Sequence, residues 1–178
     1  RIAFRTARAA DPDAILCMND WDNDGTPPQT NRNGVDRTAN MIAAVKAFKA
    51  EGVPIDCVGM ETHNAKATYA EIIAVMKAYA DLGVQVQITE WDQSGLRSNP
   101  NAVTDAASVF ARYLQACVDS PNCTVFNIWG FTQKYYSLHY GLSNGNTDLP
   151  TMFPWDATSA KTAIYDAMLN VLKGSDKK

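Results

Sequence analysis

The sequence predicts an α/β fold with a parallel sheet, of the (β/α)8 or TIM barrel class. Short strand-like runs alternate with longer segments of helical periodicity, and a polar cluster follows each strand-like run. Alternating strands and helices form parallel sheets through right-handed crossovers. The 178 residues hold four such units, half of a barrel that usually needs about 250 residues. We therefore expect a half barrel that forms a single domain over residues 1–178. An open doubly wound sheet is the alternative, but no glycine-rich phosphate loop follows any strand-like run.

Four runs are predicted to be strands. The clearest one alternates apolar and polar residues from Val84 onward and ends in two acids, Glu90 and Asp92. A period of two is the pattern of a strand. The other runs are short and apolar, which is typical of buried strands. In chain order the four runs cover residues 14–18, 55–60, 84–92 and 124–129.

Five segments are predicted to be helical. One of them begins with a capping box of Thr68 and Glu71. Gly52 and Gly83 follow two of the helices as C-terminal caps, and Ser159 is expected to cap the last helix. In chain order the helical segments cover residues 1–10, 35–49, 69–80, 103–118 and 159–171.

The bulk composition excludes some classes of protein and partner. Hydrophobic residues make up 46% of the chain and charged residues 20%, which indicates a globular domain. The net charge of −3 argues against a nucleic-acid or anionic membrane partner. No run approaches the roughly 20 apolar residues of a membrane span. The chain opens in the middle of a helix without Met or signal peptide, so we expect a mature or truncated product or part of a longer chain.

The four cysteines are expected to behave differently. Cys117 and Cys123 flank a turn-rich spacer that can close a small disulfide loop, and two free thiols are the alternative. Cys17 and Cys57 lie in apolar runs and are predicted to be buried, unreactive thiols. No Cys/His spacing suits zinc, and we expect no cofactor.

One stretch resembles the start of a calcium-binding loop. Asp20, Asp22 and Asp24 precede Gly25 in the spacing of an EF-hand-like loop. The twelfth position is Asn31, however, where such a loop needs a bidentate glutamate. An acidic, turn-forming loop is the alternative, and we expect no other metal ligands.

Polar residues follow each predicted strand. Because the carboxyl ends of parallel strands lie at one edge of a sheet, these residues should face the same opening. A carboxylate at such a strand end is where α/β enzymes place chemistry, although a solvated acid pair is the simpler alternative. The clusters are Asn19-Asp20, Glu61-Thr62-His63, Glu90-Trp91-Asp92 and Trp129-Gly130.

Motifs in a fixed order carry a resemblance to a known family. They are Asp11-Pro12-Asp13-Ala14 running into Asn19-Asp20, Gly52-Val53-Pro54-Ile55-Asp56 with Gly59 and Thr62-His63, Ile88-Thr89-Glu90 with Asp92, and Cys117/Cys123 leading into Ile128-Trp129-Gly130. This ordered set resembles the C-terminal half of the glycoside hydrolase family 10 endo-1,4-β-xylanases, over nearly the whole chain.

The resemblance implies a secreted hydrolase that cleaves internal β-1,4 bonds of xylan with retention. Two carboxyl groups about 5–5.5 Å apart act as nucleophile and acid/base in such enzymes. Glu90 matches the nucleophile, and His63 and Asp92 match the residues that orient it. An imidazole donor favours the charged form of a carboxylate, as a nucleophile requires.

The resemblance also implies a set of substrate-binding residues. Trp129 matches a sugar-stacking tryptophan, with a core aromatic as the alternative. Glu61 stands where the family commonly has Gln, which alters the charge of the pocket. Gln133 stands where an Asp is common, and Trp91 replaces a Leu. The implied substrate-binding residues are Asn19, Glu61, Trp129, Gln133, Lys134, Tyr135 and Tyr136.

The family's acid/base glutamate has no match in this chain. It would lie in a first half barrel before Arg1, so we expect that half to come from the same or a separate chain, or self-association to replace it. A non-catalytic xylan-binding half barrel is one alternative. Another retaining β-glycanase of the same fold, a cellulase or a mannanase, is the other.

Overall fold

The structure is a computed structural model that describes residues 1–28, 34–63, 65–93, 102–132, 134–135 and 152–175. Its centre is a four-stranded parallel sheet whose strands are neighbours in chain order. The strands are β1 (Cys17–Asp20), β2 (Cys57–Met60), β3 (Gln85–Trp91) and β4 (Cys123–Ile128). This is the topology expected of half a barrel, and all four predicted strands are present. The first one begins three residues later than the apolar run suggested.

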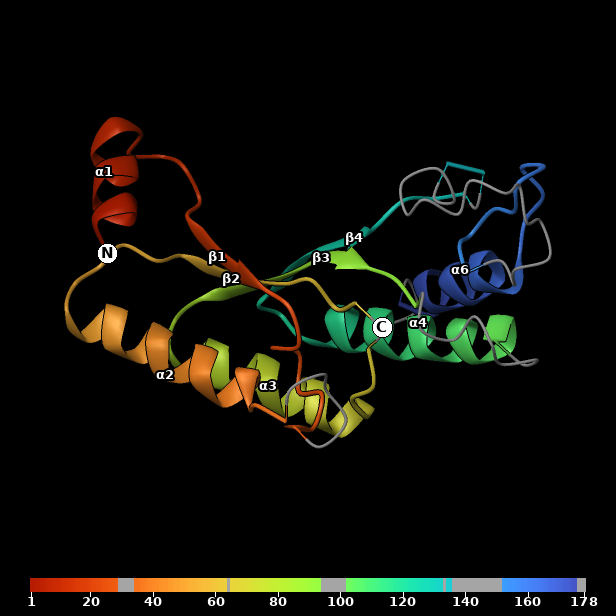
Figure 1. Cartoon of the computed structure of the whole chain (residues 1–178), viewed down its shortest axis with the longest axis horizontal. Helices are drawn as coiled ribbons and strands as arrows, with labels where there is room; N and C mark the ends of the chain where they lie inside the picture. Colours follow the sequence, from red (N-terminus) through yellow and green to blue (C-terminus); the bar gives the residue numbers. More distant parts are fainter. Residues whose placement is uncertain (29–33, 64, 94–101, 133, 136–151, 176–178) are drawn as a thin grey trace.

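The helices of the described residues connect and cover these strands. They are α1 (Ile2–Ala10), α2 (Arg37–Ala50), α3 (Tyr69–Asp81), α4 (Ala102–Asp119) and α6 (Ala163–Ser175). Helices α2, α3 and α4 lie along one side of the sheet, and α6 packs on α4 (Figure 1). Helix α1 lies beside the beginning of β1 and contains no buried residue, but its Phe4 packs edge to face on Phe48 of α2, with ring centroids 6.0 Å apart. None of the described helices is long and apolar enough to cross a membrane.

Local signals in the sequence set the ends of two helices. The predicted capping box is present, because the Thr68 hydroxyl accepts the Glu71 amide and the Glu71 carboxylate accepts the Thr68 amide. Gly52 and Gly83 follow α2 and α3 with φ of 63° and 67°, a region where only glycine is unstrained. This conformation lets the next amide reach back to the helix, from Val84 to Tyr79 in the second case.

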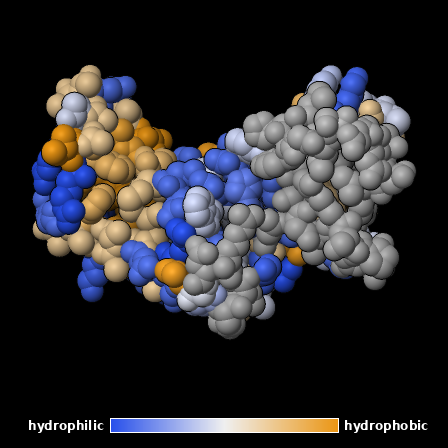
Figure 2. Space-filling model, in the orientation of Figure 1, coloured by the Kyte–Doolittle hydropathy of each residue, from blue (hydrophilic) through white to orange (hydrophobic). Residues whose placement is uncertain are grey.

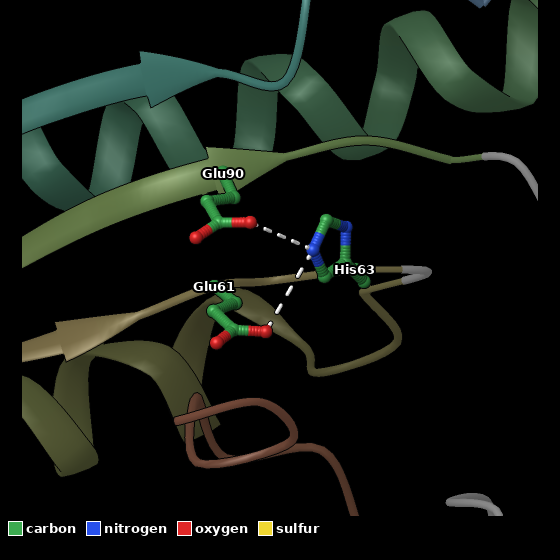
Figure 3. Close-up of side chains that lie close together, drawn as sticks. All are labelled: Glu61, His63 and Glu90. Carbon is green, nitrogen blue, oxygen red and sulfur yellow. Dashed lines mark hydrogen bonds and ion pairs between the residues drawn. The ribbon is translucent and has the colours of Figure 1, made fainter. Parts of the chain in front are cut away.

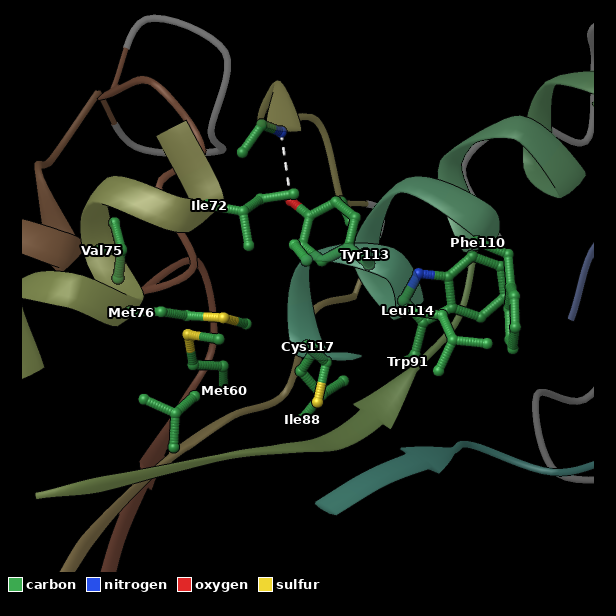
Figure 4. Close-up of a cluster of buried hydrophobic side chains, with 14 of the residues drawn as sticks. Met60, Ile72, Val75, Met76, Ile88, Trp91, Phe110, Tyr113, Leu114 and Cys117 are labelled. Atoms are coloured by element: carbon green, nitrogen blue, oxygen red, sulfur yellow. Dashed lines mark hydrogen bonds between the residues drawn. The ribbon is translucent and has the colours of Figure 1, made fainter. Parts of the chain in front are cut away.

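The core lies between the sheet and helices α3 and α4. Figure 4 shows Met60 of β2 beside Met76 of α3, and Ile88 of β3 beside Cys117 of α4. Further along, the Trp91 ring meets Phe110 edge to face, with ring centroids 4.7 Å apart. Burial of each large apolar side chain contributes about 1.5–3 kcal/mol, so this packing holds β3 in place.

The structure contradicts two predictions and confirms a third. Cys17 and Cys57 are not thiols but form a disulfide, because they are paired residues of neighbouring strands with Cα atoms 4.4 Å apart. Ser159 does not cap the last helix, because that helix begins at Ala163. The residue before it, Thr162, accepts the Ile164 amide with its hydroxyl. The predicted disulfide between Cys117 and Cys123 is present.

Candidate active site

The four strand ends deliver polar side chains to one place, as the parallel sheet predicted. Asn19 comes from β1, and Glu61 and His63 follow β2. Glu90 is the penultimate residue of β3, and a parallel bridge pairs His63 with Asp92 just beyond the strand. The middle of the face in Figure 2, over the strands of Figure 1, is mostly hydrophilic, beside a more hydrophobic part over α1.

His63 is the centre of the cluster. Its Nε2 lies 3.2 Å from Glu90 Oε2 and 3.7 Å from Glu61 Oε2, and both carboxylates point toward the ring in Figure 3. Its Nδ1 lies 3.3 Å from Asp92 Oδ2. The Asp92 side chain is only 3% exposed, whereas Glu90 is 24% exposed. The ring is therefore held from the buried side and presents Nε2 to carboxylates that solvent can reach.

A strained residue brings Glu61 and His63 to the same opening. Thr62 has φ of 55°, which costs a non-glycine residue on the order of 1–3 kcal/mol. Its side chain is buried, and its hydroxyl donates to the Met60 carbonyl. The chain therefore turns inward at Thr62, and the residues on either side of it face the cluster.

Asn19 joins the strand ends to each other. Its Nδ2 donates to Glu61 Oε1 at 3.2 Å, and its Oδ1 accepts the Thr89 hydroxyl at 2.8 Å. Gly59 lies beneath this side chain, and a Cβ there would be 2.3 Å from Asn19 Oδ1. The sequence pointed to Gly59 and Thr89 only as members of motifs. Their roles depend on the sheet register, which pairs Asn19 with Gly59.

Neighbouring charges and burial shift the pKa values of His63 and Glu61. The hydrogen bond with Asp92 raises the pKa of the His63 imidazole; the carboxylates of Glu90 and Glu61 raise it further, against the opposing effect of burial. Burial raises the pKa of the Glu61 carboxyl, and the charge of Glu90 adds to this effect. The site therefore favours a protonated imidazole surrounded by carboxylates.

Three further candidate sugar-binding residues, Trp129, Lys134 and Tyr135, follow β4 in the chain. The Trp129 ring stands edge-on to His63 at 6.0 Å between centroids and is 37% exposed, so it is not a core aromatic. Its backbone amide donates to the Trp91 carbonyl. Lys134 lies over the Tyr135 ring, which is 58% exposed. Two further predicted residues, Gln133 and Tyr136, lie outside the described residues.

Two aspartates of the calcium-like stretch have protein partners. Asp24 is buried and accepts the Tyr113 hydroxyl at 2.8 Å, and Asp20 faces Arg37. Among the described residues, the group with converging ligand atoms is Glu61, His63 and Glu90, within 4.8 Å of one another. A hydrogen bond between His63 and Glu90 and an ion-pair contact between His63 and Glu61 account for that spacing.

Comparisons with known proteins point to one family. Glycosyl hydrolase family 10 matches residues 1–171. Endo-1,4-beta-xylanase 5 of Pyricularia oryzae is 32% identical over 174 residues, 95% of this chain and 38% of that protein. Endo-1,4-beta-xylanase B of Humicola insolens is 30% identical over 179 residues, 94% of this chain and 47% of that protein.

Solved structures give the same picture. Native xylanase 10B from Thermotoga maritima superposes with a TM-score of 0.80 and 29% identity, over 99% of this chain and 52% of that chain. Xylanase 10B from Thermotoga petrophila in complex with xylobiose gives a TM-score of 0.77 and 28% identity, over 97% and 50%. The chain thus spans about half the length of these xylanases, and the expected class, a partial (β/α)8 barrel, is confirmed.

Proposed function

This chain belongs to glycosyl hydrolase family 10, and from that premise we propose that it supplies the nucleophile half of an endo-1,4-β-xylanase. The reaction is hydrolysis of internal β-1,4 bonds of xylan with retention of configuration. Glu90 is the nucleophile, and a glutamate outside this chain is the acid/base. The names of the xylanase relatives support this substrate class.

One observation carries the proposal. The partly exposed carboxylate of Glu90 is hydrogen-bonded to the His63 imidazole, and the buried carboxylate of Asp92 holds the other nitrogen of that ring. Glu90 Oε2 accepts from His63 at 3.2 Å, which leaves its other oxygen for the sugar. Asp92 fixes the ring through Nδ1. The same logic of nucleophile, orienting donor and second carboxylate recurs in covalent catalysis.

The chemistry follows from this arrangement. The free oxygen of Glu90 attacks the anomeric carbon and forms a glycosyl ester while the bond to the leaving oxygen breaks. The acid/base glutamate protonates that oxygen and then removes a proton from water, which hydrolyses the ester and restores Glu90. His63 donates to the Glu90 oxygen that does not attack. This contact compensates the negative charge of the carboxylate before attack and after release.

The remaining site residues bind the sugar chain in this proposal. Trp129 offers an exposed ring face for stacking, and polar side chains from the strand ends bind hydroxyl groups. These binding residues are Asn19, Glu61, Gln133, Lys134, Tyr135 and Tyr136.

We further propose that residues 1–178 form one domain that pairs with a second half barrel. Strands β1 and β4 lie at the edges of the sheet, and each needs a neighbouring strand to complete a barrel. Secretion is proposed as well, because two disulfides are typical of oxidising compartments.

An activated substrate tests the nucleophile without the acid/base. An aryl β-xylobioside carries a leaving group that departs without protonation, so Glu90 should form a xylobiosyl ester that intact mass spectrometry detects. Glu90→Gln should give no adduct, and the distant Glu51→Gln should behave like the parent. Absence of an adduct together with retained xylobiose binding would favour the xylan-binding alternative. An adduct from an aryl cellobioside or mannobioside instead would favour a different β-glycanase.

A further inference from the structure

Three carboxylates face the two nitrogens of one imidazole. Glu90 and Glu61 lie 3.2 and 3.7 Å from Nε2 of His63, and Asp92 lies 3.3 Å from Nδ1. A neutral imidazole has one N–H, so one of its nitrogens turns a lone pair toward a carboxylate. If that nitrogen is Nε2, the lone pair meets two carboxylates. Only the doubly protonated ring offers an N–H donor to the carboxylates at both of its nitrogens.

We propose that Glu61 is a positioning residue that keeps His63 doubly protonated and therefore bonded to Glu90. Asp92 and Glu90 each supply one acceptor, and Glu61 supplies a second negative charge on the Nε2 side. We assign no attack on the sugar to Glu61, because both of its oxygens have protein partners: Oε1 accepts the Asn19 amide and Oε2 lies 3.7 Å from His63 Nε2. The inference rests on the proposed function of Glu90.

The placement of Glu61 is specified by the fold. Asn19 holds one carboxylate oxygen and is itself held by the Thr89 hydroxyl of β3. The Glu61 side chain is 20% exposed, so its charge is only partly screened by water. Burial of this carboxyl raises its pKa, and its charge in turn contributes to the raised pKa of His63. The charge of Glu61 therefore acts on His63 in the pH range in which Glu61 is ionised and His63 changes its protonation state.

The other charges near this pair act in known directions. From β3, Glu90 and Asp92 both raise the pKa of His63. From the end of β1 and the loop after it, Asp20 and Asp22 raise the pKa of Glu61. Arg37 of α2 pairs with Asp20. Removal of Glu61 therefore takes one of three contributing carboxylates from His63 and leaves the other two.

Titration of His63 by NMR tests the proposal without any activity. The chain has two histidines, so His139→Gln assigns the imidazole signals. Glu61→Gln keeps the acceptor for Asn19 but removes the charge, and it should lower the pKa of His63. Glu61→Asp keeps the charge and should leave that pKa closer to the parent's. Glu51→Gln, a change of equal charge near Arg1, should leave it unchanged. An unchanged His63 titration in Glu61→Gln, or an equal fall in Glu61→Asp, would overturn the proposal.

The pH profile of xylan hydrolysis gives the catalytic readout, measured on the enzyme with both half barrels. In Glu61→Gln the alkaline limb of kcat should move to lower pH, because His63 loses its proton earlier. An unmoved limb in an active variant whose His63 pKa has fallen would contradict the link to Glu90. If the parent does not hydrolyse xylan, the proposed function fails, and the NMR result still decides the role of Glu61.

Discussion

Asn19 and Gly59 are paired residues of neighbouring strands, and the Asn19 side chain occupies the space that a Cβ at position 59 would need. The distance from that Cβ to Asn19 Oδ1 would be 2.3 Å, which no real Cβ tolerates. Asn19 in turn reaches Glu61 and Thr89. A glycine in the middle of β2 thus allows one amide side chain to connect three strands.

Gly59→Ala should therefore displace Asn19 and loosen Glu61. Forcing a methyl group into a filled site costs on the order of 1–3 kcal/mol, and urea denaturation should show this loss. Gly174→Ala is the matched control, because nothing lies within 4 Å of its added Cβ. Equal stability of the two variants would show that Asn19 can move aside freely.

The stability of the protein should fall as the pH rises through the titration of Glu61 and His63. Both groups have a folded pKa above the unfolded value, which is 4.5 for Glu61 and 6.5 for His63. The stability they contribute is complete below those unfolded values and is lost as the pH rises through each folded value. In His63→Gln the part of this decline above pH 6.5 should disappear. The measurement is the free energy of unfolding by urea at several pH values, with His139→Gln as the control.

Removing the two disulfides should have unequal effects. The bridges span 40 residues between Cys17 and Cys57 and 6 residues between Cys117 and Cys123. By loop-closure entropy the longer bridge contributes about 4 kcal/mol and the shorter about 2.2 kcal/mol. Paired Cys→Ala variants, compared by thermal unfolding, should rank in that order. The opposite ranking would indicate that unfolded-state entropy does not dominate here.

Thr68→Ala should destabilise α3. The substitution removes the hydroxyl that accepts the Glu71 amide, and loss of such a cap costs about 1 kcal/mol. Thr104→Ala, on the exposed side of α4, is the control and should be neutral or slightly stabilising, because alanine is the better helix former. Chemical denaturation of both variants distinguishes capping from a general effect of losing a threonine.

The two tryptophans near the site should separate stability from binding. Trp91 is 1% exposed and packs on Phe110, so Trp91→Ala should cost about 3–5 kcal/mol. Trp129 is 37% exposed, so Trp129→Ala should cost much less stability but weaken the binding of xylo-oligosaccharides. Calorimetry for unfolding and for binding checks both. Unchanged sugar affinity in Trp129→Ala would remove this ring from the proposed site.

The outlines of the fold were readable in the sequence because they depend on neighbouring residues. Alternation from Val84 predicted β3, and the pair Thr68 and Glu71 predicted the start of α3. The rule that parallel strands end at one edge then predicted that the clusters of His63, Glu90 and Asp92 face one opening, and the family resemblance implied that His63 and Asp92 orient Glu90.

Tertiary structure alone decided which distant side chains touch. The strand register joined Cys17 to Cys57, where the sequence suggested two thiols, and it set Asn19 over Gly59. The left-handed turn at Thr62 and the second carboxylate on His63 were equally unreadable. Local order is encoded in contiguous residues through periodicity and capping. Contacts across the sheet depend on how separate strands align, and no contiguous stretch of the chain records that alignment.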